Sequence, residues 1–376
     1  SLAPHVILDF GNHGVLGLQV DPGLGGVGLG HRDALRVIEQ LGAIDQTLAM
    51  MTIVHNTLGI GPIRDFAAPA LRETLLPRLA SGRELVAFAI TEPGAGSNPK
   101  AIAATATPES ADRWRLHGRK LWSGNAGWAS VINVFAHSRL ADGTGEGLVG
   151  FALPRSTPGL VVGEEAMTLG MRAMVQNAIA LDGALALREH LLGEPGAGMA
   201  VAQSAMMQGR LHIAAACIGG IKRCAQLLLR YAGRRAIAGG PMLGNPVVRA
   251  RLADLGASAV ILEALVEEVA ARLDGGRPVP AGAYIVCKTA GPEWLWQAAD
   301  DLVQFLGGRG YIESNMAAGL LRDARVARIL EGPTEALTMH LGSLLVNEPA
   351  SLRQWLVDDL GQAPVMQRLE AAAAEI

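Results

Sequence analysis

Leu85-Val86-Ala87-Phe88-Ala89-Ile90 marks the point where the chain changes from a helical to a β-type sequence. Before this stretch, from Ala34 to about Arg83, apolar residues recur at spacings of three or more, as amphipathic helices require. After it, short apolar runs such as 131–135 and 148–153 are separated by Gly, Pro, Ser and Asn, which is typical of strands and turns. The sequence therefore predicts a β-rich region from 84 to about 190 that follows a helical region.

A helical period returns after Pro195-Gly196, and Gly-Pro turns join the helices, which indicates a bundle. The expected helices are 199–233, 246–273, 281–306 and 333–347. The order of helices, strands and helices lacks the strict alternation of a doubly wound sheet, so the predicted fold class is α+β. We expect an N-terminal helical domain (1–83), a middle β domain (84–192), a C-terminal helical bundle (193–350) and a C-terminal tail (351–376).

The composition excludes several classes of protein. With 376 residues, 50% hydrophobic and 18% charged, the chain has enough apolar sequence for a large core and is not of a disordered type. A net charge of -3 gives no basic surface for nucleic acid or an anionic membrane. The apolar runs stay below the ~20 residues that span a bilayer.

The three cysteines, Cys217, Cys224 and Cys287, form neither a disulfide framework nor a Cys-x-x-Cys metal motif. The sequence predicts a cytoplasmic protein without a metal site. The start of the sequence shows no basic and apolar leader pattern, and a start at Ser1 without Met fits a processed, trimmed or excised segment.

Glu331 is the leading candidate for a catalytic base. Ile329 and Leu330 precede it, and such apolar neighbours would desolvate the carboxylate and raise its pKa. Gly332, before Pro333, would let another molecule approach the backbone closely. The alternative is a structural glutamate near a helix end.

The glycine-rich stretch Gly23–Gly28 matches the G-x-G-x-x-G dinucleotide fingerprint, and it follows a plausible strand, Val15–Val20. However, Asp21-Pro22 separates that strand from the glycines, and the residues before Asp45, the expected acidic partner, continue a helical pattern. The pattern favours a glycine-rich turn between helices.

Two strand ends carry small and polar residues that suit a ligand. The segment Phe88–Ser97 ends in Thr91-Glu92-Pro93-Gly94-Ala95-Gly96-Ser97, and a turn of this kind can approach a flat ring or a phosphate. Gly118–Ala126 places Trp122 at the end of another strand, beside small residues. Taken singly, each segment is better explained as a polar hairpin turn.

Together these segments resemble the acyl-CoA dehydrogenase family. The resemblance rests on Thr91–Ser97, Gly118-x-Lys120-x-Trp122, Gln304-x-x-Gly307-Gly308-x-Gly310-Tyr311, Arg322-Asp323-Ala324-Arg325 and Glu331-Gly332, in the family's order and spacing. It covers nearly the whole chain and implies an N-terminal helical domain, a middle β-barrel domain and a C-terminal four-helix bundle. It also implies that FAD lies between the last two domains.

The resemblance assigns residues to the cofactor. It implies that Phe88, Ile90, Thr91, Gly96 and Ser97 lie at the isoalloxazine ring, with Ser97 also facing the substrate, and that Trp122, Ser123 and Gly124 lie beside the flavin. Arg235 corresponds to an arginine that reaches the FAD pyrophosphate of a neighbouring subunit, and Gln304, Gly307 and Gly308 to adenosine-side contacts. The remaining assignments are Thr334 and Glu335 for the cofactor, Arg210 and Gly332 for the substrate, and Glu331 for the base.

Some residues depart from the family pattern. The family has a flavin-contacting threonine in Trp-x-Thr-Asn, where this chain reads Trp122-Ser123-Gly124-Asn125, so that hydroxyl is absent or comes from Ser123. Gly209 stands where a subset of the family carries another glutamate base, which leaves Glu331 without that rival. Arg210 is equally consistent with a buried ion pair and with a substrate contact.

The resemblance implies α,β-dehydrogenation of an acyl thioester carried by CoA or a carrier protein. Glu331 would remove the α-proton while the β-hydrogen leaves as hydride to the flavin N5. An electron-transfer flavoprotein or oxygen would accept the electrons, and the protein would be a homodimer or homotetramer. Two alternatives stay open: a flavin oxidase or monooxygenase acting on a non-thioester substrate, and a flavin-free binding scaffold. If Glu331 were not the base, Glu335 and Glu92 would be the next candidates.

Overall fold

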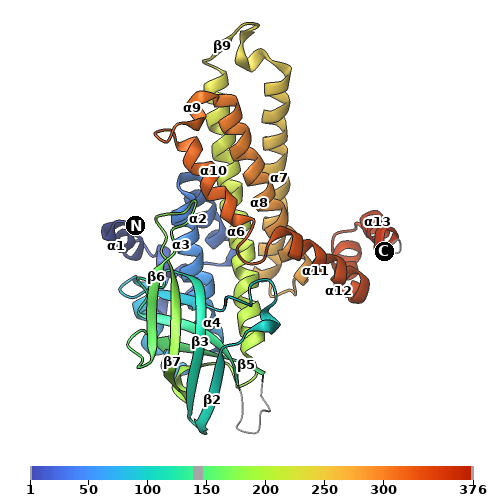
Figure 1. Cartoon of the computed structure of the whole chain (residues 1–376). Helices are drawn as coiled ribbons and strands as arrows, with labels where there is room; N and C mark the ends of the chain where they lie inside the picture. Colours follow the sequence, from blue (N-terminus) through green and yellow to red (C-terminus); the bar gives the residue numbers. More distant parts are fainter. Residues whose placement is uncertain (1, 139–146, 374–376) are drawn as a thin grey trace. The chain divides into compact units, whose positions relative to one another are not determined.

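The computed structural model describes residues 2–138 and 147–373, so parts of the expected domains at 1, 139–146 and 374–376 lie outside the described residues. The chain forms two compact units. One combines the residues up to Leu41 with Asp45–Gly209, and the other combines Gly42–Ile44 with the residues from Arg210 onward. The helices and strands of both units carry the labels of Figure 1.

The first unit begins with helices of different burial: α1 has no buried residue, whereas α3 is almost entirely buried. Asp45 caps α3 because its Oδ1 accepts hydrogen bonds from the amides of Thr47 (2.7 Å) and Leu48 (2.9 Å). The residues of the π-helical segment η3 are all buried. The elements are α1 (Pro4–Asn12), α2 (His31–Ile44), α3 (Gln46–Ile53), η3 (Val54–Ile60), α4 (Gly61–Phe66) and α5 (Pro69–Ala80).

The expected strand Val15–Val20 is wrong, because this segment forms the short 3-10 helix η1 (Val15–Gly17) and a turn. The side chain of Asn56, from η3, takes the place of a neighbouring strand. Its Oδ1 accepts from the Leu18 amide and its Nδ2 donates to the Val15 carbonyl, both at 3.0 Å. The backbone groups that would enter a sheet are thus satisfied locally.

The expected middle β domain is confirmed as a mixed eight-stranded sheet. The strands pair in the order β6-β7-β3-β2-β4-β5-β8, while β1 pairs with β4 off this path. The pairs β1–β4 and β2–β4 are parallel and the others are antiparallel. The strands are β1 (Val86–Ala89), β2 (Thr105–Ser110), β3 (Arg113–Gly124), β4 (Val131–Ser138), β5 (Gly147–Pro154), β6 (Leu160–Glu165), β7 (Gln176–Leu187) and β8 (Leu191–Leu192).

The N-terminal helices join the sheet through its central strand β4, which is almost entirely buried. Asn133, on β4, donates from Nδ2 to the carbonyls of Leu58 (3.0 Å) and Gly59 (2.8 Å) in η3. A buried amide that satisfies two carbonyls fixes the position of η3 on the sheet.

The second unit is a bundle of long helices, which the sequence predicted to within two residues at each end (Figure 1). They are α6 (Gly198–Ala232), whose residues up to Gly209 belong to the first unit, α7 (Pro246–Asp274), α8 (Ala281–Leu306) and α11 (Thr334–Asn347). The unpredicted α10 (Met316–Ala327) packs against α8. At Gly291 a Cβ would lie 3.3 to 3.4 Å from Ala214, Leu262 and Cys217, so α6, α7 and α8 meet closely there.

Shorter elements complete this unit. A small hairpin of β9 (Ala236–Ile237) and β10 (Gly240–Pro241) follows α6, and α9 (Gly308–Tyr311) follows α8. The expected C-terminal tail contains α12 (Pro349–Arg353), η7 (Gln354–Asp359) and α13 (Ala363–Ala373). An ion pair between Arg272 and Asp359 (2.8 Å) connects it to α7.

No helix within residues 2–138 and 147–373 combines the length and the apolar character needed to cross a membrane.

Candidate active site

The loop Arg328–Thr334, called the base loop here, places Glu331 in a left-handed conformation. Glu331 has φ 56° and Gly332 has φ 105°. For a residue with a Cβ, this region costs roughly 1–2 kcal/mol. Backbone strain of this kind persists where the surrounding structure enforces it, and it is concentrated at functional sites.

The Glu331 carboxyl has the properties of a poised base. Its Oε2 is buried and has no hydrogen-bond partner in the described part of the chain. Burial raises the pKa of Glu331 to about 7, and the positive charges of Arg210 and Lys288 oppose that rise. A carboxylate with a pKa near the working pH is suited to general-base catalysis.

The rise of the Glu331 pKa by burial agrees with the sequence prediction, but one of the two residues expected to cause it does not. The Ile329 side chain is 49% exposed, so Ile329 was wrongly expected to desolvate the carboxylate. Gly332 is explained by the loop itself, since its positive φ disfavours a side chain and a Cβ would lie 3.0 Å from Leu337.

Two buried cations, from α6 and α8, hold successive carbonyls of the base loop. Arg210 donates from Nε to the Glu331 carbonyl (3.1 Å), and Lys288 donates from Nζ to the Gly332 carbonyl (3.2 Å). Arg210 thus contacts the backbone of Glu331, and its charge also acts on the Glu331 carboxyl. The substrate contact that the sequence left open stays a prediction. Lys288 was not predicted at all, although a lone lysine directly after the apolar run Ala283–Cys287 was a usable signal.

Four predicted cofactor residues of the second unit, Arg235, Gln304, Gly307 and Gly308, lie near one end of its helices. Arg235 is exposed on the β9 hairpin, and its carbonyl accepts from the Met242 amide (2.8 Å). Met242 belongs to an apolar cluster that also contains Phe305, next to the exposed Gln304. Gly307 and Gly308 follow, and no described atom lies within 4 Å of a Cβ built on either one.

The remaining two predicted cofactor residues differ in their surroundings. Thr334 begins α11, and its hydroxyl donates to Glu293 (2.8 Å). Glu335 is exposed.

In the first unit, the predicted ligand turn Phe88–Ser97 is tied to the sheet. Phe88 is buried in β1 against Phe135, with ring centroids 5.0 Å apart. The Thr91 carbonyl accepts from the Leu121 amide (2.9 Å), which brings this turn next to Trp122 as the sequence pattern required.

Glu92 anchors the same turn and is not free to act as a base. It forms a buried ion pair with Lys120 (2.6 Å) and accepts from the amides of Ala103 (2.6 Å) and Ala104 (3.1 Å). Although burial alone would raise the pKa of Glu92, these donors hold it below its usual range.

Trp122 and its neighbours form an unusual end to β3. Trp122 has φ 51° and is 63% exposed, so its indole is displayed to the surroundings of the unit. The Ser123 hydroxyl is buried and finds no partner within the described residues. At Gly124 a Cβ would lie 2.5 Å from Met174 Cε, so the methionine occupies the space of a larger side chain.

These features fit a flavin nucleotide. An exposed indole can stack on a flat ring, and the Ser123 hydroxyl needs a partner that the described chain does not provide. Gly94 and Gly96 of the first unit are open, because no described atom lies within 4 Å of a Cβ built on either one. The backbone of this turn is therefore accessible to a ligand.

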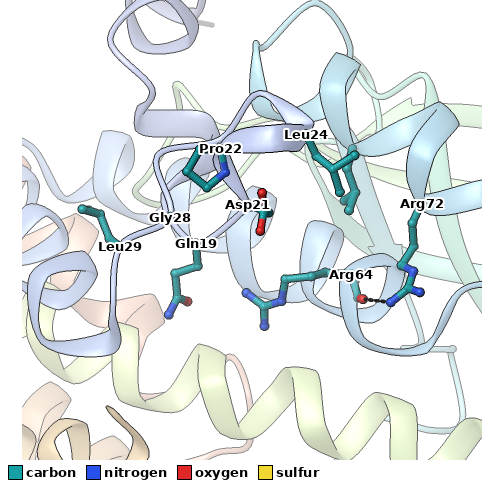
Figure 2. Close-up of a pocket in the computed structure, with 9 residues that line it drawn as sticks. Gln19, Asp21, Pro22, Leu24, Gly28, Leu29, Arg64 and Arg72 are labelled. Atoms are coloured by element: carbon teal, nitrogen blue, oxygen red, sulfur yellow. Dashed lines mark hydrogen bonds between the residues drawn. The ribbon is translucent and has the colours of Figure 1, made fainter. Parts of the chain in front are cut away.

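A separate hollow of about 410 Å³ lies beside the glycine-rich stretch in the first unit. Figure 2 shows Asp21, Arg64 and Arg72 around it, with a hydrogen bond from Arg72 to the Arg64 carbonyl (3.4 Å). The Asp21 side chain caps the short 3-10 helix η2 (Pro22–Leu24) by accepting from the Gly23 amide. The stretch is thus a loop that leads from η2 to α2, which confirms the prediction of a turn between helices.

His, Cys, Asp and Glu side chains form no cluster suited to a metal ion within residues 2–138 and 147–373.

Three family models cover most of the chain. They describe the N-terminal, middle and C-terminal domains of acyl-CoA dehydrogenase, and they match residues 2–83, 87–184 and 196–345.

Proteins with similar sequences are also acyl-CoA dehydrogenases. The chain is 31% identical over 333 residues to the mitochondrial very long-chain specific acyl-CoA dehydrogenase of Bos taurus, which covers 87% of this chain and 51% of that protein. It is 30% identical over 341 residues to an acyl-CoA dehydrogenase of Bacillus subtilis (strain 168), which covers 91% and 89%. The chain thus spans about half the length of the very long-chain relatives.

Among solved structures, butyryl-CoA dehydrogenase from Megasphaera elsdenii is similar with a TM-score of 0.86 and 26% identity, over 92% of this chain and 90% of that one. Acyl-CoA dehydrogenase complexed with FAD from Bacillus anthracis has a TM-score of 0.85 and 25% identity, over 97% and 64%. The order of helices, mixed sheet and bundle agrees with these matches. The chain therefore belongs to the acyl-CoA dehydrogenase family.

Proposed function

We propose that the protein is an FAD-dependent oxidoreductase that introduces an α,β double bond into an acyl thioester, with Glu331 as the base. The observation that carries this proposal is the Glu331 carboxyl, whose Oε2 is buried and lacks a hydrogen-bond partner in the described part of the chain. A buried group that the fold leaves unpaired is costly, so it is retained where function requires it.

The base loop determines what Glu331 can do. Because burial raises the pKa of Glu331 to about 7, the carboxylate is substantially ionised at neutral pH and still basic enough to take an α-proton at its oxygen. Arg210 and Lys288 hold the carbonyls of Glu331 and Gly332, which limits the rotation of the residue that carries the base. FAD, when bound, supplies the acceptor for the β-hydride at its N5.

The proposed cofactor residues are those of the family pattern. In the first unit they are Phe88, Ile90, Thr91, Gly96, Ser97, Trp122, Ser123 and Gly124. In the second unit they are Arg235, Gln304, Gly307, Gly308, Thr334 and Glu335. Ser97, Arg210 and Gly332 are proposed to face the substrate, whose acyl group would be carried by CoA or a carrier protein.

Association into a homodimer or homotetramer is part of the proposal. Arg235 and Gln304 are both exposed, in keeping with contacts to a cofactor held by a neighbouring subunit. Near them Ile237 and Tyr311 are 40% and 84% exposed, and exposed large apolar side chains of this kind favour a protein interface. An electron-transfer flavoprotein or oxygen would be the acceptor, and the location would be cytoplasmic.

The test is anaerobic bleaching of the bound flavin by a panel of acyl-CoA and carrier-bound acyl thioesters. We expect at least one thioester to reduce the wild-type flavin. Glu331→Gln should keep the flavin and the substrate-induced spectral change, because the amide is nearly isosteric, but reduction should slow by about 10²- to 10⁴-fold. Reduction of this variant at the wild-type rate would show that Glu331 is not the base.

A flavin oxidase on the same fold is the second candidate. Gly124, with Met174 in the adjacent space, replaces a threonine that the family pattern places beside the flavin, which favours an altered reactivity of the reduced flavin. No bleaching by any thioester, together with reduction by an amine or alcohol, would favour this candidate. A purified protein that binds no flavin after reconstitution would instead favour a binding scaffold.

A further inference from the structure

The base loop is closed at both ends by one carboxylate of α8. Glu293 Oε1 accepts from Arg328 Nε (2.6 Å) at the start of the loop and from Thr334 Oγ1 (2.8 Å) at its end. The Thr334 amide also donates to the Arg328 carbonyl (3.1 Å). Because the two ends are joined in this way, Glu331 lies within a closed loop whose shape depends on α8.

A second group of α8, Lys288, acts on the middle of the same loop. Its side chain is fully buried, and its ammonium donates to the Gly332 carbonyl, directly after the base. A buried ammonium is expensive unless it has partners, and an uncharged donor would satisfy a carbonyl at lower cost. A lysine at this place therefore indicates that the positive charge itself has a use.

We propose that Lys288 is a positioning residue for Glu331, which holds the peptide after the base through the Gly332 carbonyl and provides a positive charge that keeps the carboxylate ionised. This inference rests on the proposed function, because it assigns Lys288 a role toward the proposed base. It concerns a residue that the sequence pattern did not single out, and it requires no contact between Lys288 and the substrate.

The charges around Lys288 support an electrostatic role. The groups that face it are Arg210 and Cys217 from α6, Glu293 from α8 itself and Glu331 from the base loop. Burial lowers the pKa of Lys288 to about 8, and burial raises the pKa of Cys217 to about 12, so at neutral pH the lysine is largely charged and the thiol is neutral.

The sign of the effect follows from these values. Burial raises the pKa of Glu331 to about 7, while the charges of Arg210 and Lys288 lower it. Without the charge of Lys288, the pKa of Glu331 should rise further, and a smaller fraction of the base would be ionised at neutral pH. Lys288 thereby extends to lower pH the range in which the Glu331 carboxylate is ionised.

The test compares the pH dependence of flavin reduction in wild type, Lys288→Gln, Lys288→Met and Lys288→Arg. Lys288→Gln keeps a donor for the Gly332 carbonyl but removes the charge, so it separates charge from hydrogen bonding. We expect the midpoint of the rate to move upward by about one pH unit in Lys288→Gln and Lys288→Met, which is a tenfold loss of ionised base at low pH. Lys288→Arg should restore the wild-type midpoint. The dissociation constant of the substrate should change little in any of them.

Lys222→Gln is the matched control, because Lys222 is a partly exposed lysine of α6 paired with Glu263 (3.0 Å). Its midpoint should equal that of wild type. If Lys288→Gln slows reduction equally at every pH and leaves the midpoint unchanged, Lys288 is only a structural residue and the proposal is overturned.

A measurement without turnover separates this inference from the proposed function. The carboxyl carbon of Glu331 can be followed by carbon-13 NMR and assigned by its loss in Glu331→Gln. An upward shift of its titration midpoint in Lys288→Gln supports the role of Lys288 even if no thioester reduces the flavin, in which case the proposed function alone fails. An unchanged midpoint overturns the role of Lys288 whether or not the enzyme is active.

Discussion

The buried ion pair Glu92–Lys120 shows how single residues hold the ligand turn of the first unit. The Lys120 side chain is fully buried and that of Glu92 is 4% exposed, so the charges depend on each other and on the amides of Ala103 and Ala104. Removing one partner of such a pair leaves the other charge uncompensated, which typically costs about 3–5 kcal/mol.

We therefore expect Glu92→Gln to lower the free energy of unfolding by about 3–5 kcal/mol at neutral pH, as measured by chemical denaturation. Because the pKa of Glu92 is held below 4.5 in the fold, its contribution is present above that pH and is lost as the pH falls through the folded value. The difference between wild type and variant should shrink below about pH 4.5. The control is Glu109→Gln, since Glu109 pairs with Arg115 at the surface (2.7 Å) and should contribute less than about 1 kcal/mol. Equal losses in the two variants would contradict this view of Glu92.

At this scale the sequence singled out Glu331, the proposed base, and Arg210, but not Lys288 or Glu293. Glu331 was recognisable because a carboxylate next to a Gly-Pro break is a local pattern. Lys288 and Glu293 lie 43 and 38 positions earlier in the chain, and their contacts with the base loop arise only when α8 packs beside it. Tertiary contacts of this kind leave no periodic signal in the sequence.

At the scale of elements, the backbone conformation of the base loop depends on one glycine, Gly332. Gly332 has φ 105°, and a Cβ would lie 3.0 Å from Leu337 at the first turn of α11. An alanine here would add conformational strain and force Leu337 to move.

Gly332→Ala is expected to lower the free energy of unfolding by about 1–3 kcal/mol and to slow flavin reduction, because Glu331 precedes the altered peptide. Gly342→Ala is the matched control within α11, where no described atom lies within 4 Å of a built Cβ. It should stabilise the helix slightly, since alanine is a better helix former than glycine. Thermal unfolding and single-turnover reduction check both variants, and a Gly332→Ala protein with wild-type stability and rate would refute the expectation.

The long helices were predictable and the short or irregular elements were not. The helices α6, α7 and α8 each repeat their apolar period over many turns, which makes their bounds visible in the sequence. By contrast, α10 has only 12 residues, and its pattern is too short to separate from the turns around it. Val15–Val20 has the composition of a strand, but the Asn56 side chain satisfies its backbone, which no local pattern could reveal.

At the scale of the whole molecule, the proposed chemistry is divided between the two units. The turns with Thr91 and Trp122 belong to the first unit, whereas Glu331 and its two cations belong to the second. A measurement that responds to only one unit can thus show which unit unfolds or opens.

The cysteines supply such an observable. All three in the chain belong to the second unit, and Cys217, Cys224 and Cys287 are each at most 1% exposed. Burial raises the pKa of each thiol to about 12, so the reactive thiolate is scarce while the helices stay packed. We expect a thiol-specific dye to leave the native protein unlabelled and to react with three sites in denaturant. Rapid labelling of the native protein would contradict this. If the native protein is labelled only slowly, the labelling rate reports the transient opening of the helical bundle alone. This measurement uses the unaltered protein and needs no attached probe.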